Sequence, residues 1–222
     1  MATPVLGYVA AGAVFVPAAV GIARYKLLDQ AMKLFTVFSL TSCLSVSAAF
    51  ILGLFKIKNY IVSDIYHLVE VPFLALIYHT AIASASVRRI LKGCILVYVA
   101  VWLADQLYFA DPARLNNALA MTSRIFLVVM SIIALHAFLK STEARLTKEP
   151  MFWIITGTIL YSSGSLVVVA LSNELYKMGL TYFVIGWYIN WTLSIVATLM
   201  FTKGLLCSSQ AQTYYGLSSE RV

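Results

Sequence analysis

The chain has 222 residues, of which 61% are hydrophobic and 11% charged, a composition outside the range of soluble globular domains. Its formal net charge is +7, but the lysines and arginines stand in short segments between apolar runs. Because that arrangement is typical of membrane topology determinants, nucleic-acid binding is not expected.

Apolar runs of about 20 residues, the length that a bilayer core demands, recur seven times along the sequence. In chain order we place them at 4–23, 32–54, 60–83, 90–109, 117–138, 152–172 and 180–202. The connections are short, so consecutive helices should be antiparallel neighbours. The sequence therefore predicts an all-α membrane protein, a bundle of seven transmembrane helices over residues 1–205 with a polar cytoplasmic tail at 206–222.

Lysine and arginine are distributed unequally between the two sides of this predicted bundle. Eleven lie in the first, third and fifth connections and the tail, against four in the opposite connections. Because cytoplasmic loops carry the excess of positive residues, the N-terminus is predicted outside and the C-terminus in the cytoplasm. We expect a multi-pass protein of the cell (inner) membrane.

The third span carries three ionisable residues, Asp64, His67 and Glu70, at spacings of three. On a helix their side chains fall within an arc of about 120°. Ionisable groups inside a membrane helix are costly and point to function. Other spans place polar groups at similar depth, between the midplane and the outer surface. The predicted ligand-binding polar centre comprises Asp64, His67, Glu70, Asp105, Arg124, Tyr188 and Asn190.

In this range of depth the sequence places three carboxyl groups and a single arginine, Arg124. Because full ionisation would leave two negative charges uncompensated in a low dielectric, we expect one ion pair, between Arg124 and Asp105 or Asp64. Glu70 would then be protonated, bonded to His67, or holding a cation. Two interpretations stay open for the layer: a closed polar network that fixes helix packing, or a ligand site.

Metal and cofactor sites find little support. His67 and Glu70 form an H-x-x-E pair, but His79 lies about 18 Å along the same helix, which excludes a three-histidine zinc centre. Lys203 lies at the cytoplasmic end of the seventh span, so a retinal Schiff base is excluded as well. We expect neither metal nor cofactor. The alternative that stays open is a carboxylate-rich metal site of Asp64, His67, Glu70 and Asp105.

Four segments carry a resemblance to a known group: IYHLVEVPFLALIYHTAI, NNALAMTSRIFLVVMSIIALHAFL, FWIITGTILYSSGSL and WYINWTLSIVATLMFTKGL. Over helices three to seven the chain resembles a broad group of uncharacterised bacterial seven-helix membrane proteins. The matching positions are Glu70, Arg88 with Arg89, Phe152 with Trp153, and Asn190. Since the group has no established activity, the resemblance implies the fold and a common polar centre.

The leading functional hypothesis is a non-enzymatic membrane protein that binds a small ligand, ion or proton in a polar cavity of the outer half. A sensory or receptor-like role is favoured over transport, because the polar groups are expected to stop near the midplane. The alternative is an intramembrane enzyme acting on a lipid, with Glu70 and His67 as acid and base and Arg124 on an anionic head group. Expected partners are membrane lipids and the small ligand or ion, and a homo-oligomer stays open.

Overall fold

A computed structural model describes residues 5–57, 59–108, 117–141 and 146–219, with side chains described up to Cys207. This part of the chain consists of helices and short connections, without a strand. Its elements in order are α1 (Val5–Ala13), α2 (Phe15–Ala23), the 3-10 turn η1 (Tyr25–Leu27), α3 (Gln30–Leu54), α4 (Tyr60–Ala81), α5 (Ala85–Tyr108), α6 (Asn117–Ser141), the 3-10 turn η2 (Leu146–Lys148), α7 (Pro150–Met178) and α8 (Leu180–Ser219).

Seven of the described helices are long and apolar enough to cross a membrane, as predicted. The first crossing is made jointly by α1 and α2. Proline lacks a backbone N–H, so Pro17 cannot donate to the carbonyl of Ala13, and α1 ends at Ala13. Cys43 of α3 donates to the carbonyl of Val14 at 3.5 Å and so ties the break to the next helix.

The structure extends several helices beyond the predicted apolar runs. The Asp29 side chain accepts from the Met32 backbone N–H at 2.8 Å, which starts α3 two residues earlier than predicted. Pro150 starts α7 at the position that proline tolerates. α8 continues to Ser219, so much of the segment predicted as a polar tail is helical.

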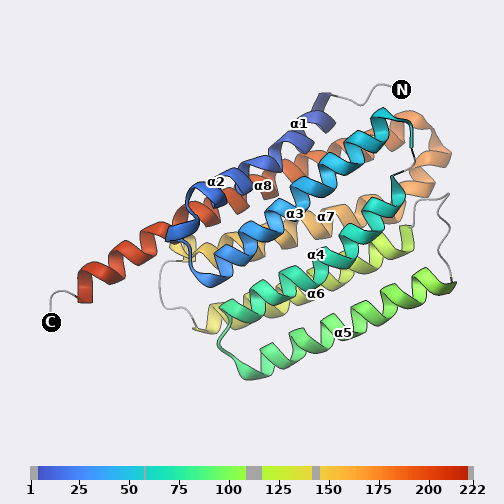
Figure 1. The fold of residues 1–222 in the computed structure, drawn as a ribbon. Coiled ribbons are helices and arrows are strands. Elements are labelled where there is room, and N and C mark those ends of the chain that lie inside the picture. The colour runs from blue at the N-terminus through green and yellow to red at the C-terminus, as the bar shows by residue number, and fades with distance from the viewer. Residues whose placement is uncertain (1–4, 58, 109–116, 142–145, 220–222) are drawn as a thin grey trace.

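The helices lie side by side in a bundle with the two chain ends at opposite ends (Figure 1). α8 contacts α7, α1 and α2, whereas α4 contacts α3, α5 and α6. α5 lies at one edge of the bundle, and it buries only Leu91 and Tyr98. The N-terminal end of the bundle is hereafter the end where α1, α4, α6 and α8 begin. The C-terminal end is the opposite one.

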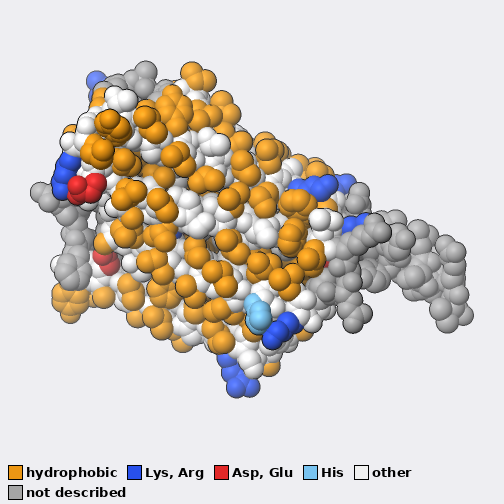
Figure 2. Space-filling view, turned by 180° about the vertical axis from the view of Figure 1, so that it is seen from behind, with side chains coloured by type: hydrophobic (Ala, Val, Ile, Leu, Met, Phe, Trp, Pro, Cys, Tyr) orange, Lys and Arg blue, Asp and Glu red, His pale blue; other side chains and the backbone are white. Residues whose placement is uncertain are grey.

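On the face that Figure 2 shows, hydrophobic side chains predominate, and charged side chains collect toward the ends of the bundle. Large side chains such as Leu44 and Leu96 are 70% and 73% exposed. Such extensive apolar exposure suits helices that face hydrocarbon instead of water. The fold therefore fits a multi-pass membrane protein, and the sidedness stays a prediction.

Close apolar packing is concentrated in the C-terminal half of the bundle. Its fully buried members include Phe35, Tyr78, Leu127, Ile154 and Leu205, from five different helices. The Tyr78 hydroxyl is 2.9 Å from Ser131 Oγ, which satisfies both groups within the apolar core.

Gly21 permits a close contact between α2 and α3. A Cβ atom on Gly21 would lie 2.6 Å from Thr36 Cγ2, so α2 and α3 pack closely only because this side chain is absent. A Cβ on Gly12, in the same membrane crossing, would meet nothing within 4 Å.

Candidate functional site

A buried ion pair joins α4 to α6 near the middle of the bundle. Arg124 Nη1 donates to Glu70 Oε1 at 2.8 Å, and the relative exposures of the two residues are 4% and 3%. The guanidinium carbon of Arg124 also lies 4.8 Å from the ring centroid of Tyr161 on α7. The cation is thus held by a carboxylate on one side and an aromatic face on another.

The predicted partner of Arg124 was wrong, because the arginine pairs with Glu70 and not with Asp105 or Asp64. Both aspartates are half-buried and line neither cavity described below. Asp105 Oδ2 accepts from the neighbouring Gln106 at 3.4 Å, and the backbone carbonyl of Asp64 accepts from Trp102 Nε1 at 3.1 Å. Each step along a helix turns a side chain by 100°, so residues at equal depth can face different neighbours.

His67 lies beside the ion pair on α4 and is also buried. Its Nδ1 atom is 3.3 Å from Ser123 Oγ and 3.5 Å from Glu70 Oε2. Its backbone carbonyl accepts from the Tyr98 hydroxyl at 2.9 Å, which fixes α4 against α5. The predicted H-x-x-E face therefore exists as a histidine and a glutamate in one polar cluster with the arginine.

The carboxylate-rich metal site gains no support from this arrangement. Among the described residues, no three His, Cys, Asp or Glu side chains come close enough together to hold a metal ion. All four members of the hypothetical site lie within the described ranges, and Asp64 and Asp105 do not join the other two.

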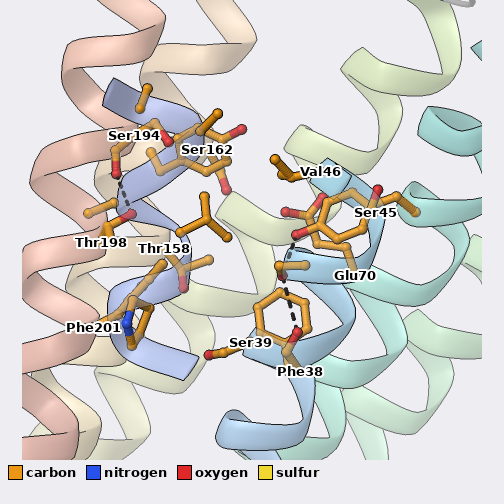
Figure 3. Close-up of a pocket in the computed structure, with 18 of the residues that line it drawn as sticks. Phe38, Ser39, Ser45, Val46, Glu70, Thr158, Ser162, Ser194, Thr198 and Phe201 are labelled. Carbon is orange, nitrogen blue, oxygen red and sulfur yellow. Dashed lines mark hydrogen bonds between the residues drawn. The ribbon is translucent and has the colours of Figure 1, made fainter. Parts of the chain in front are cut away.

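A cavity of about 300 Å³, here called the serine cavity, lies on the Glu70 side of the ion pair. Figure 3 shows Glu70 and Ser45 on one wall and Ser162, Ser194 and Thr198 on the other. Its polar lining consists of Ser39, Ser42, Ser45, Tyr66, Glu70, Thr158, Tyr161, Ser162, Asn190, Ser194 and Thr198. Phe35 and Phe201, whose ring centroids are 5.2 Å apart in an edge-on contact, line it as well.

A second cavity of about 230 Å³, here called the arginine cavity, lies on the other side of the pair. Its polar lining includes Ser63, Tyr66, His67, Asn117, Arg124, Tyr161, Ser165, Ser172 and Asn190. Asn117, near the N-terminal end of the bundle, donates to Ser172 Oγ at 3.0 Å. Because Tyr66, Tyr161 and Asn190 line both cavities, the cavities share a wall, and the ion pair lies within it.

The described buried side-chain atoms without a hydrogen-bond partner all belong to residues that line these cavities. They are Glu70 Oε2, Asn117 Oδ1, Ser162 Oγ and Asn190 Oδ1. A buried polar atom without a partner costs about 1–3 kcal/mol, so native proteins rarely leave several in one place. Unsatisfied polar groups that coincide with hollow space suit a polar occupant.

Besides the two aspartates, the predicted site included a third residue that lines neither cavity, and it omitted several residues that do. Tyr188 is 40% exposed, packs against Trp191 with ring centroids 5.5 Å apart, and lines neither cavity. The prediction missed Tyr66 and the serines of α3. Ser39, Ser42 and Ser45 recur at every third position, a spacing that places them on one helix face and could have revealed them.

The polar groups also extend farther than the sequence suggested. Ser39, Thr158 and Thr198 lie roughly 5–9 Å beyond the centres of their spans, toward the C-terminal end. The expectation that polar groups stop near the midplane was therefore wrong for the hydroxyl groups.

The fold and site define a seven-helix bundle of the membrane type with a buried ion pair between two cavities that combine polar and apolar lining. Comparisons with family models, with curated proteins and with solved structures find no match to this chain. That result agrees with the resemblance to a group without an established activity, and the function must be argued from the site.

Proposed function

We propose that the protein binds a small polar solute in the cavities beside Glu70 and Arg124, and acts as a receptor-like protein of the cell (inner) membrane. One observation carries this proposal: the buried pair lies in a wall between two cavities whose linings, although largely apolar, hold every unpartnered buried polar atom described. The distribution of lysine and arginine favours an external N-terminus, which would turn the arginine cavity toward the outside.

Packing favours reception over transport. Phe35 and Phe201 end the serine cavity toward the C-terminal half, where closely packed apolar side chains such as Met32 and Ile154 follow. A solute that reached Glu70 from the N-terminal end would meet this apolar core ahead of it. The lipid-enzyme alternative gains no support from the contacts, because Glu70 already engages the arginine assigned to a head group.

The proposal is tested by thermal unfolding of the purified protein in lipid nanodiscs with a panel of water-soluble solutes. The panel contains amino acids, amines, carboxylic acids, sugars and inorganic ions. A solute at 100 times its Kd stabilises the folded state by about 2.7 kcal/mol. We expect one class to raise the Tm of the natural protein and of Glu174→Gln, a surface control, but not of the double variant Glu70→Gln/Arg124→Gln.

A second measurement asks whether the arginine cavity admits small polar molecules. Ser165→Cys, in a background with Cys43, Cys94 and Cys207 replaced by alanine, should react with a small water-soluble thiol reagent. If the introduced thiol stays unreactive and no solute changes the Tm, the polar layer is a closed packing network and the proposal fails.

A further inference from the structure

The charges around the two cavities cancel. Among the described residues that line either cavity, Glu70 is the only acid and Arg124 the only lysine or arginine. The formal charges of this acid and this base therefore cancel. Its two charged groups also face different spaces, since Glu70 lines the serine cavity and Arg124 the arginine cavity.

This balance discriminates among classes of ligand. A cation that bound Glu70 alone would leave the Arg124 guanidinium buried without a counter-ion. An anion that bound Arg124 alone would leave the Glu70 carboxylate without one. A molecule with one ammonium and one carboxylate group offers a counter-ion to each partner. It replaces one ion pair by two and leaves no charge uncompensated.

We propose that the solute is a small zwitterion of the free amino-acid type, which inserts between Glu70 and Arg124. This inference rests on the proposed function and names the ligand of that site. The ammonium group is held from the serine cavity by Glu70, whose Oε2 has no hydrogen-bond partner and only the longer 3.5 Å contact with His67 Nδ1. The carboxylate group is held by the Arg124 guanidinium, a fork that matches carboxylate geometry.

Further groups suit the same ligand. An ammonium group has three N–H donors, and Ser162 Oγ and Asn190 Oδ1 are unpartnered oxygens in the lining of the serine cavity. Leu74 and Phe38 give the same cavity apolar surface for a short side chain. A volume of about 300 Å³ stands at the lower end of ligand pockets, which favours a small molecule.

The experiment measures binding of L-alanine to the full chain in nanodiscs, with methylammonium, acetate and glycerol as probes that carry one charge or none. We expect L-alanine to bind at least about 100-fold more tightly than each of the other three. Glu70→Gln/Arg124→Gln, which keeps the site neutral, should lose L-alanine binding by a similar factor, and Glu174→Gln should leave it unchanged. Arg124→Lys, which keeps the charge but not the fork, should bind about tenfold more weakly.

The alternative outcomes separate this inference from the proposed function. If methylammonium, acetate or glycerol binds as tightly as L-alanine, the site recognises one charge or none, and the zwitterion inference is overturned while solute binding stands. The same holds if another member of the solute panel raises the Tm and L-alanine does not. If no solute in the panel binds, both proposals fail. If the double variant does not fold, the affinity of Arg124→Lys for L-alanine tests the inference instead. An unchanged affinity would contradict the role assigned to the guanidinium.

Discussion

Removal of one partner of the Glu70–Arg124 pair should destabilise the bundle strongly. Glu70→Gln leaves the guanidinium buried and unpaired, and we expect the free energy of unfolding to fall by about 3–5 kcal/mol. The contact distance is 2.8 Å, and the two side chains are 4% and 5% exposed. At an effective dielectric constant near 20, unit charges about 4 Å apart attract each other by about 4 kcal/mol, which agrees with that range.

A double-mutant cycle isolates the interaction. Glu70→Gln, Arg124→Gln and their combination are unfolded with SDS in mixed micelles, and the transition is followed by circular dichroism. The combined variant buries two neutral amides in place of two charges, so it should lose less stability than the more damaging single variant. If the stability lost by the double variant equals the sum of the two single losses within about 0.5 kcal/mol, Glu70 and Arg124 are not coupled. The claim that their ion pair stabilises the bundle is then refuted.

The chain supplies a matched control for burial. Lys177 Nζ lies 2.7 Å from Glu174 Oε1, almost the same distance, but these side chains are 70% and 64% exposed. Glu174→Gln should cost less than about 1 kcal/mol, because water and salt screen an exposed pair. A cost equal to that of Glu70→Gln would show that burial is not the cause of the effect.

Three other predictions concern packing and sidedness. Gly21→Ala places a methyl group in the α2–α3 contact and should lower stability by about 1–3 kcal/mol in the same SDS assay, whereas Gly12→Ala should not lower it. Tyr78→Phe removes the buried hydroxyl contact between α4 and α6 and should cost about 1 kcal/mol; no change would mean that the bond contributes nothing. In intact cells and a cysteine-free background, Lys177→Cys should react with a membrane-impermeant thiol reagent, and Lys92→Cys only after permeabilisation. The reverse pattern would contradict the predicted orientation.

The seven membrane-length helices could be predicted because the signal lies in the composition of each segment. A bilayer-length run of apolar residues needs no knowledge of its neighbours to be recognised. The ends of the helices were harder to predict. The start of α3 depends on the Asp29 cap, and α8 continues past its apolar run. Hydropathy does not report either feature.

The partner of Arg124 could not be predicted from the sequence. The position of a residue along its helix gives its depth in the membrane, but a contact also depends on which way the side chain faces and on which helices are neighbours. Asp64, Asp105 and Glu70 all lay within reach by depth, and only the packing of α4 against α6 turned Glu70 toward the arginine. Asp105 lies on α5, the helix at the edge of the bundle, and does not line the cavities. The third-position serines of α3 could have been predicted to share a face, because their spacing is visible in the sequence.

α8 is 40 residues long, so it measures about 60 Å, twice the thickness of a hydrocarbon core. Figure 1 shows it projecting past the other helices toward the C-terminus. Its first half carries Asn190 into both cavities, and its last turns lie clear of the bundle. If a helix of this length moved as a rigid rod, a tilt of about 5° about Phe201 would displace Ser219 by about 2 Å.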